Sequence, residues 1–377
     1  MRMILFEDQY TPNLEPIIMT RPVFDLRFGS NTLLNRVAKI CSEDIISFWV
    51  RDELLERTAE IYPDAIINKA PNEETLWLNA RVLWTKKLIS DLKNSSAGIF
   101  MNGNNLIGAK LSKSVAEEWL KSGGPLSFFP PEGEVHHIDD TILINYLWDL
   151  LALIPKAVEE SKISNYISPK LKYVIIDESE ADVFIDEDVI VEPFSYLKGP
   201  LYIGKKSIIS SHSKIRNSVI GSECKIGGEV SGTIIQGNTN KVHDGFLGDS
   251  YLGEWVNLGA GTTNSNLKNN YQPVVMQVNK ELVRSERQFL GSVIGDHSKT
   301  AIGTQLNTGT NIGVGCNIMA QTFSDRHIPS FTFFDQGKYQ EINFNKFIQT
   351  AEIVKNRRKK SLKPCEKKLL ETLFLSR

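Results

Sequence analysis

Aliphatic side chains return every six residues over a long stretch of the chain, from Ile185 to about Ser324. The step is kept at two runs of anchors: Ile185, Val191, Leu197, Ile203, Ile209 and Ile215, then Ile294, Thr300, Leu306, Ile312 and Ile318. An α-helix repeats near 3.6 residues and an amphipathic strand every two, so neither explains this period. The period predicts hexapeptide repeats that wind into a parallel β-helix with the anchors inside.

The six-residue step is interrupted twice, and both interruptions are rich in Gly and Asn. After Ile226 the aliphatic register is lost until Leu252, across the polar stretch 237–245. The second interruption, 259–291, includes a segment that predicts a protruding hairpin turning near Asn279-Lys280. Because the interior of a solenoid is committed to packing, we expect function at such excursions.

The first 165 residues or so follow a different pattern, in which short β-branched runs alternate with helical ones. The predicted strands are 3–6, 45–50 and 65–67, and the predicted helices between them are 31–41 and 52–61. This alternation indicates a parallel α/β sheet. Asn102-Gly103 predicts a type I′ hairpin between 98–101 and 105–111.

Further helices are expected at 112–121 and 141–153, and the charged stretch 159–169 reads as a linker. The chain then divides into an α/β domain (1–165), a β-helix (166–330) and a tail (331–377). In the tail, Phe344, Phe347 and Ile348 begin a helical spacing that predicts an amphipathic helix packed on the β-helix or across a trimer. The basic run 355–360 is expected to support that helix; phosphates of coenzyme A or nucleic acid are alternative partners.

Composition places few restrictions on function. The chain has 377 residues, 41% of them hydrophobic, and a net charge of −2, as in an ordinary soluble protein with room for two cores. Its charge implies neither nucleic acid nor a membrane as partner, and its start reads as a short strand, so we expect a cytoplasmic protein. The four cysteines are scattered without a CxxC, which argues against disulfides and zinc.

Three stretches carry candidate chemistry. His243 lies in the first interruption and is suited to proton transfer near neutral pH, although an exposed loop histidine without a role is the alternative. Arg21, Asp25 and Arg27 precede a helix, where they bind a phosphate or form a structural cluster. The sequence 136–140, His-His-Ile-Asp-Asp, invites a metal, but an aspartate capping the next helix is favoured, so no metal site is predicted.

The second interruption opens with Gly259-Ala260-Gly261-Thr262-Thr263. Its backbone N–H groups are little obstructed by side chains, which suits an oxyanion or a thioester carbonyl. The same composition is also ordinary for the corners of a β-helix.

The stretch 243–249, His-Asp-Gly-Phe-Leu-Gly-Asp, followed by 256–262 and Asn266, resembles the active-site region of the GlmU-like family. These bacterial enzymes join an N-acetylglucosamine-1-phosphate uridylyltransferase to a glucosamine-1-phosphate N-acetyltransferase. The resemblance implies a Rossmann-like α/β nucleotidyltransferase domain followed by a trimeric left-handed β-helix and a C-terminal helix. The stretches 20–22 and 295–300 are similar to a divergent branch of the family with a shorter first domain.

The resemblance implies roles for individual residues. His243 falls on the catalytic base, Asn257 and Asn266 on contacts to the amino sugar, Glu229 on a sugar-contacting acid, and Ala260 with Gly261 on the acetyl-CoA site. Glu229 or Asp244 would orient the imidazole.

Two departures affect phosphate binding. Phe246 and Ser231 replace a tyrosine and a lysine that bind the sugar phosphate in the family, and Lys241 or Lys268 is the expected substitute. In the first domain the glycine-rich phosphate loop is missing, which leaves Arg21 and Arg27 as nominated nucleotide-phosphate ligands, with Mg²⁺ bridging the phosphates.

The resulting hypothesis is an acetyl-CoA-dependent N-acetyltransferase of an amino-sugar 1-phosphate, coupled to nucleotidyl transfer from a nucleoside triphosphate in the synthesis of UDP-N-acetylglucosamine. Its alternatives are a sugar nucleotidyltransferase whose β-helix only assembles or regulates it, and an inactive scaffold. A homotrimer is expected in the first reading.

Overall fold

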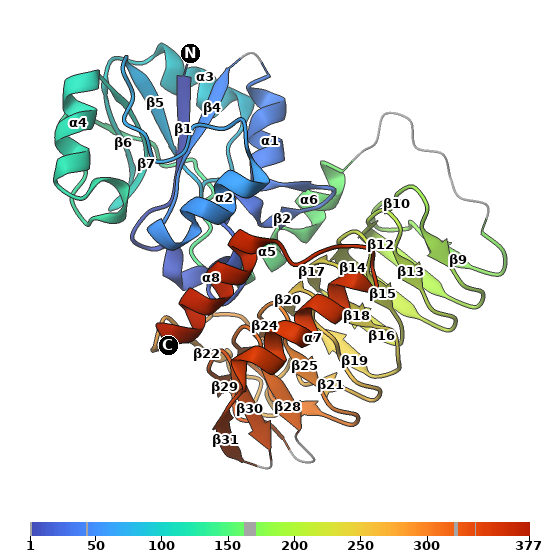
Figure 1. The fold of residues 1–377 in the computed structure, drawn as a ribbon. Helices are drawn as coiled ribbons and strands as arrows, with labels where there is room; N and C mark the ends of the chain where they lie inside the picture. The colour runs from blue at the N-terminus through green and yellow to red at the C-terminus, as the bar shows by residue number, and fades with distance from the viewer. Residues whose placement is uncertain (1, 43, 162–170, 320–322, 336) are drawn as a thin grey trace. The chain divides into compact units, whose positions relative to one another are not determined.

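The computed structural model describes residues 2–42, 44–161, 171–319, 323–335 and 337–377. These residues form two compact units (Figure 1). The first unit contains Met1–Asn13, Thr20–Leu26 and Asn31–Asn145, and the second contains Leu14–Met19, Arg27–Ser30 and Tyr146–Arg377. The second unit thus includes two short early segments and the helices after Tyr146, which the sequence pattern assigned to the first domain. Most of the predicted linker lies outside the described residues.

The first unit is built on a six-stranded mixed sheet with the order β4-β1-β5-β7-β6-β8. β1 runs parallel to β4 and β5, whereas β7 runs antiparallel to β5 and β6. The strands of this sheet are β1 (Arg2–Phe6), β4 (Ile45–Trp49), β5 (Thr75–Asn79), β6 (Gly98–Asn102), β7 (Asn105–Leu111) and β8 (Val135–His137), and β3 (Asn31–Thr32) is not part of it. The α/β class and a hairpin between β6 and β7 are confirmed, but the turn residues are Gly103 and Asn104 and only Gly103 has a positive φ, so the turn is not of the predicted type I′.

Three helices of this unit, α1 (Leu33–Ile40), α3 (Lys86–Asn94) and α4 (Lys113–Lys121), start at hydroxyl caps, whereas α2 (Leu55–Ile61) follows Leu54 without a side-chain cap. Thr32, Thr85 and Ser112 each accept a hydrogen bond from a backbone N–H of the first turn, which satisfies one of the free donors there. Short 3-10 helices are η1 (Thr11–Leu14), η2 (Ile17–Thr20), η3 (Val23–Asp25), η4 (Asp52–Leu54) and η5 (Gly124–Leu126).

Three local predictions were wrong or incomplete. The stretch 65–67 makes only an isolated bridge, between Phe48 and Ile67. β5 was missed because all five of its residues are buried, so it shows no alternation of polar and apolar positions. The helix expected at 141–153 begins only at Leu147 and is split into α5 (Leu147–Ala152) and α6 (Ile154–Glu159).

The late start of α5 has a local cause. Asp149 accepts a hydrogen bond from the backbone N–H of Tyr146 at 2.9 Å, which fixes the first turn there. Upstream, Leu143 is held in an antiparallel bridge with Val82. Asp139 and Asp140 therefore cap no helix.

The second unit is a parallel β-helix whose core is a set of inward-facing rows. One row runs in register through Ile203, Ile220, Ile235, Leu252, Ile294, Ile312 and Ile328, all buried. β2 (Arg27–Phe28) belongs to the second unit but to none of the sheets of the β-helix. The early strands of the β-helix are β9 (Ile175–Asp177), β10 (Val183–Ile185), β11 (Ile190–Val191), β12 (Tyr196–Ile203), β13 (Ile208–Ile209), β14 (Lys214–Ile220), β15 (Lys225–Ile226), β16 (Glu229–Ser231), β17 (Ile234–Gly237), β18 (Asn240–Lys241), β19 (Phe246–Gly248) and β20 (Tyr251–Glu254). The later ones are β21 (Thr263–Asn264), β24 (Ser292–Ile294), β25 (Lys299–Thr300), β26 (Gln305–Leu306), β27 (Thr310–Ile312), β28 (Asn317–Met319), β29 (His327–Ile328), β30 (Thr332–Asp335) and β31 (Lys338–Glu341).

The first interruption seen in the sequence is not an excursion from the solenoid. Val230, Ile235 and Leu247 continue the inward rows, with shortened corners between them. At the next inward position the row that contains Ile226 continues with Lys241, which is 1% exposed. The aliphatic register was lost because the coil is shorter and one anchor is a lysine.

The second interruption does contain the predicted hairpin, formed by β22 (Val275–Val278) and β23 (Glu281–Arg284). Asn279 and Lys280 both have positive φ, as a type I′ turn requires.

The tail forms α7 (Phe344–Asn356) and α8 (Pro364–Leu375). α7 lies along the coils (Figure 1), with Phe347 edge-on to Phe331, so the predicted packing helix is confirmed. The basic run is tied down within the unit, since Lys355 pairs with Glu366 at 2.5 Å and Lys360 with Glu223 at 2.9 Å.

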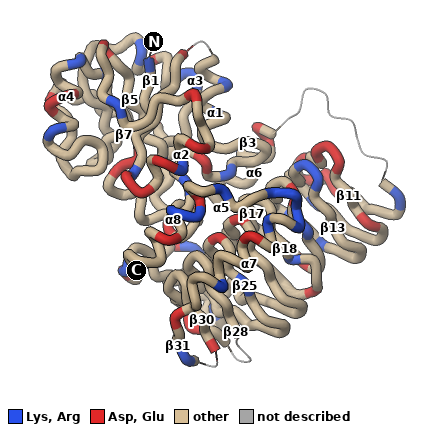
Figure 2. The backbone as a smooth tube through the Cα atoms, viewed as in Figure 1, with Lys and Arg blue, Asp and Glu red and all other residues tan. Residues whose placement is uncertain are grey.

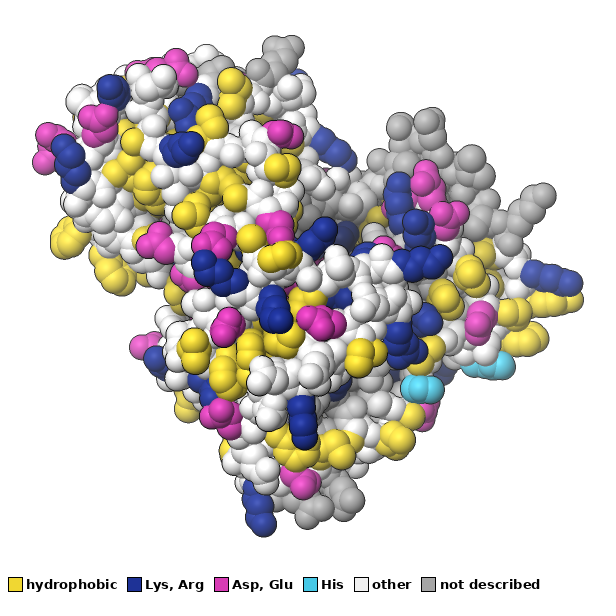
Figure 3. Space-filling view, in the orientation of Figure 1, with side chains coloured by type: hydrophobic (Ala, Val, Ile, Leu, Met, Phe, Trp, Pro, Cys, Tyr) yellow, Lys and Arg dark blue, Asp and Glu magenta, His cyan; other side chains and the backbone are white. Residues whose placement is uncertain are grey.

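The surface is mixed in character. Basic and acidic residues are interspersed over both units (Figure 2), and Lys198–Glu180 and Lys205–Glu187 pairs link successive coils. On the face drawn in Figure 3, hydrophobic side chains lie in small groups among charged ones. No helix in the described parts of the chain is long and apolar enough to span a membrane.

We expect Ile235→Ala to lower the free energy of unfolding of the β-helix by about 2–5 kcal/mol, because it leaves a cavity inside a continuous row. The matched control is Ile190→Ala, whose parent side chain is 56% exposed and should contribute within roughly 0.5 kcal/mol. Urea denaturation followed by circular dichroism measures both. Equal stability of the two variants would contradict the continuous row.

Lys241 makes stability depend on pH. Burial lowers its pKa to about 8, whereas an unfolded lysine titrates near 10.4, so between these values the unfolded chain binds more protons and stability rises with pH. Relative to that of Lys241→Met, the free energy of unfolding of the wild type should rise by about 2 kcal/mol between pH 7.5 and 9.5. If the difference in free energy of unfolding between the two proteins does not change over this pH range, the Lys241 ammonium stays protonated inside the β-helix.

Candidate active site

The corner between β18 and β19 presents His243 and Asp244 to solvent. Gly245 follows them with φ of 106°, and a Cβ there would meet the carbonyl oxygen of Thr262 at 2.1 Å, so the corner needs glycine. In the described chain no group hydrogen-bonds to the His243 ring, which leaves the imidazole open to a substrate. Neither Glu229 nor Asp244 orients the ring in this structure.

Lys241 holds this corner from inside the prism. Its Nζ donates to the carbonyl oxygens of Gly227 at 2.8 Å, His243 at 2.9 Å and Asp244 at 3.3 Å. These three acceptors use the hydrogen-bonding capacity of the ammonium, and the side chain does not reach the outer surface. Lys241 thus fixes the backbone beneath His243 and does not face a sugar phosphate.

Asp244 connects the two corners that the sequence singled out. Its Oδ1 accepts a hydrogen bond from the Gly261 N–H at 3.2 Å. The Ala260 carbonyl accepts from Gly303 N at 2.7 Å, so the second corner is also tied to the next coil. Among the described residues nothing accepts the Ala260 N–H, which leaves this donor available to an oxyanion.

The outer face next to the corner gathers further predicted residues. Glu229 and Phe246 are paired across adjacent coils. A Cβ on Gly248 would lie 2.4 Å from the Phe246 ring and 2.8 Å from Asn266 Nδ2, so both side chains stand over this glycine. Asn266 donates to Asp249 at 2.7 Å, and burial raises the pKa of the Asp249 carboxyl.

Arg216 also belongs to this face, and the sequence analysis missed it. Its guanidinium lies 3.3 Å from Glu229 Oε1, and its Nε donates to Ser231 Oγ at 3.2 Å. The register of the strand could have revealed this residue. Arg216 follows the inward Ile215 by one position and therefore points outward, and it is paired with Ser231 on the next coil. It supplies a cation beside the position where the family's lysine is absent.

Asn257 lies on a neighbouring face of the same coils. Asn240 Nδ2 donates to Asn257 Oδ1 at 2.6 Å, and the two residues are bridged across adjacent coils. Lys268, the other substitute considered for the phosphate, donates to the Pro273 carbonyl at 3.4 Å. The structure thus groups Glu229, Phe246 and Asn266, with Asn257 on another face.

The three residues nominated for nucleotide phosphate are divided between the two units, with Arg21 and Asp25 in the first and Arg27 in the second. Arg21 is 5% exposed, and Asp25 accepts a hydrogen bond from the Tyr62 hydroxyl at 2.5 Å; burial, with Asp25 beside it, raises the Tyr62 pKa. Arg27 belongs to the second unit, where its Nε donates to the Gln236 carbonyl at 2.8 Å.

The acidic residues after β1 stand where the family's glycine-rich loop would be. Glu7 pairs with Arg51 at 3.1 Å, and Asp8 receives two hydrogen bonds from Arg81, at 2.8 and 2.7 Å. Both carboxylates are buried and neutralised by arginines. This arrangement does not fit a Mg²⁺ site, and we derive no step through that ion.

Comparisons with known proteins match this architecture. Residues 3–162 match the family model of sugar nucleotidyl transferases. The chain is 33% identical over 204 residues to the bifunctional protein GlmU of Methanocaldococcus jannaschii, which covers 49% of this chain and 45% of that protein. It is 34% identical over 155 residues to the bifunctional sugar-1-phosphate nucleotidylyltransferase/acetyltransferase of Sulfurisphaera tokodaii, which covers 40% of this chain and 39% of that protein.

The chain therefore spans less than half the length of these relatives. A solved structure from Bacillus cereus, named as a candidate acetyltransferase, aligns with 54% of this chain and 98% of that chain at 16% identity. Its TM-score is 0.21, so this alignment supports no conclusion about fold or function. The chain is thus similar to sugar nucleotidyl transferases over residues 3–162 and to bifunctional GlmU proteins over about half of its length, which agrees with the family resemblance seen in the sequence.

Proposed function

We propose that the β-helix unit is an acetyl-CoA-dependent N-acetyltransferase of an amino-sugar 1-phosphate, with glucosamine-1-phosphate as its substrate. The observation that carries this proposal is the hydrogen bond from Gly261 N to Asp244 Oδ1, because it joins the histidine corner to the Ala260 corner. A base and a free backbone donor are thereby held on connected corners, as acyl transfer needs. The bifunctional names of the relatives agree with this assignment.

The amine is mostly protonated at neutral pH, and it reaches its neutral, nucleophilic form by releasing one proton to solvent before it attacks. His243 removes a proton as the amine nitrogen attacks the thioester carbonyl carbon, and the Ala260 N–H donates to the oxygen as it becomes an oxyanion. When the tetrahedral intermediate collapses, the carbon–sulfur bond breaks. The proton on the imidazolium then passes to the departing thiolate, which returns His243 to its neutral form.

Substrate binding is assigned to the outer face. Glu229 is placed to accept hydrogen bonds from the sugar or its ammonium, and Asn266 stands over Gly248 together with Phe246, the residue paired with Glu229. The phosphate is assigned to Arg216 in place of Lys241, because Arg216 presents its charge outward whereas Lys241 is buried. A homotrimer with acyl-CoA held between neighbours belongs to this proposal.

The first unit is proposed to act as a sugar nucleotidyltransferase in the same pathway, on the strength of its family match. The ion pairs of Glu7 and Asp8 argue for a phosphate site unlike the usual backbone cradle. Two assays separate the activities: thiol release from acetyl-CoA with glucosamine-1-phosphate, and pyrophosphate release from each nucleoside triphosphate with a sugar phosphate. Pyrophosphate release alone would favour a β-helix that only assembles the enzyme.

His243→Ala should lower kcat for acetyl transfer by roughly two to four orders of magnitude, the usual range for loss of a general base. Its melting temperature should not change, because the side chain is exposed and makes no hydrogen bond among the described residues. His137→Ala, at an exposed histidine of the first unit, is the control and should keep full activity. Wild-type acetyl transfer by folded His243→Ala would refute the mechanism.

Arg216→Met should raise KM for glucosamine-1-phosphate by roughly ten- to hundredfold with little change in kcat, because a charge-assisted contact to the phosphate is lost. Lys198→Met is the matched control, since Lys198 occupies the same register one coil earlier and pairs with Glu180. Steady-state kinetics measure both. A selective fall in kcat in the Arg216 variant would instead assign this residue to the chemical step.

A further inference from the structure

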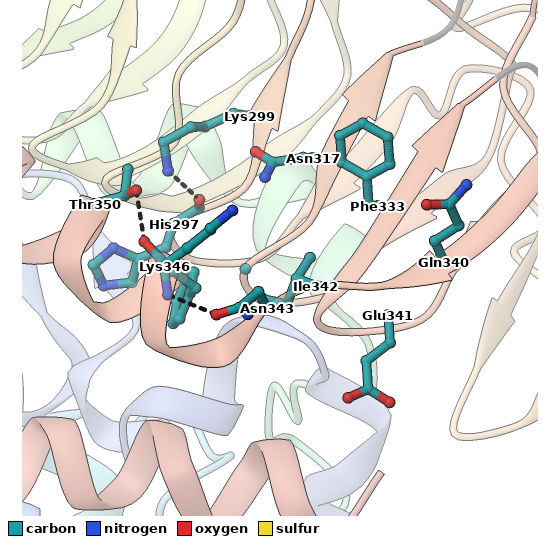
Figure 4. A pocket seen from close by; sticks show the side chains of 12 residues that line it. His297, Lys299, Asn317, Phe333, Gln340, Glu341, Ile342, Asn343, Lys346 and Thr350 are labelled. Carbon is teal, nitrogen blue, oxygen red and sulfur yellow. Dashed lines mark hydrogen bonds between the residues drawn. The ribbon is translucent and has the colours of Figure 1, made fainter.

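A second concave site lies away from the His243 corner, on the outer face of β25, β28 and β30 where α7 covers it. It is a cavity of about 350 Å³, and its walls include Lys299, Asn317 and Phe333 from successive coils and Lys346 from α7 (Figure 4). Nothing in the proposed acetyl transfer uses this cavity.

The charges that line the cavity do not balance within the protein. Lys299 Nζ donates to the His297 carbonyl at 2.9 Å, which uses one of its three N–H groups. In the parts of the chain that are described, no carboxylate pairs with Lys299 or Lys346. The lining carboxylate, Glu341, pairs with Arg377 at 2.5 Å.

Holding the charged Lys299 ammonium in this site costs free energy. Burial lowers its pKa to about 8, which shows that the site disfavours the charged ammonium. His297, 3% exposed, also has a buried Nδ1 without a partner among the described residues. An anion in the cavity would offset the cost of the desolvated cation.

We propose that this cavity binds the phosphate group of an organic phosphate, with Lys299 and Lys346 as its cationic contacts. Asn317 and Gln340 add amide N–H donors, and Phe333 with Ile342 gives an apolar wall for the rest of the molecule. Lys299 is bridged to Asn257 on the preceding coil, so the cavity lies on the face that carries Asn257. The anion site stands without the acetyltransferase proposal; only the choice of organic ligands rests on that function.

Calorimetric titration of the full chain with inorganic phosphate, glucosamine-1-phosphate, coenzyme A and phosphate-free pantetheine tests the proposal. Lys299→Met should weaken binding of a phosphate ligand by roughly ten- to hundredfold, and the ligand affected identifies the source of the phosphate. Lys225→Met is the matched control, because Lys225 is exposed in the same outward row. Pantetheine should be unaffected.

A pH series supplies a second readout. The charged or titratable groups lining the cavity are His297, Lys299, Glu341 and Lys346. Wild-type affinity for phosphate should fall as the pH rises above about 8, where Lys299 loses its proton, whereas Lys299→Arg should hold its affinity because arginine stays charged.

The proposal is overturned if no phosphate ligand binds the wild type at millimolar concentration, or if folded Lys299→Met binds all of them as tightly as Lys225→Met does. Because titration needs no turnover, these outcomes are independent of acetyl transfer by His243 variants.

Discussion

The inward rows of the β-helix determine where every outward side chain of the candidate site stands. Each inward residue is fixed by its partners one coil above and below, so its neighbours in sequence are forced outward. Ile215 thereby places Arg216 on the outer face, and Leu247 places Phe246 beside Glu229 and Gly248 beside Ser231. The chemistry on the surface depends on the continuity of the packing inside.

Beneath the candidate site, polar residues replace aliphatic ones in the interior of the β-helix. Lys241 and Asn264 take inward positions that aliphatic residues hold in other coils. Lys241 donates to three carbonyls under the His243 corner, and Asn264 bonds to both the N–H and the carbonyl of Gly248, at 2.8 and 3.0 Å. Satisfied buried polar groups fix backbone geometry more specifically than aliphatic contacts do. The β-helix gives up apolar burial at the level where the site needs a defined backbone.

The β-helix could be predicted from the sequence because close packing sets its period and leaves a repeating pattern of aliphatic residues. The inward position of Lys241 could not be predicted, because a lysine at an anchor position cannot be distinguished from a loop lysine without the coil above it. β5 was missed for a related reason, since burial on both faces removes alternation. Arg216 could have been found by extending the register outward from Ile215.

The candidate site itself was predicted in part. The motifs around His243 and Ala260 were readable, yet their connection through Asp244 and Gly261 depends on corners seventeen residues apart in sequence and adjacent in space. The role of the Arg27 side chain could not be assigned from sequence, because its partner, Gln236, lies 209 residues further along the chain.

The central claim is that the His243 corner and the Ala260 corner together form the acetyl-transfer site. A crystal structure of the protein with coenzyme A and glucosamine-1-phosphate tests it most directly. The account predicts the sugar amine within hydrogen-bonding reach of the His243 ring, about 2.6–3.2 Å, and the coenzyme A thiol beside the Ala260 N–H. Ligands bound in full occupancy with the amine and thiol elsewhere on the β-helix would contradict it.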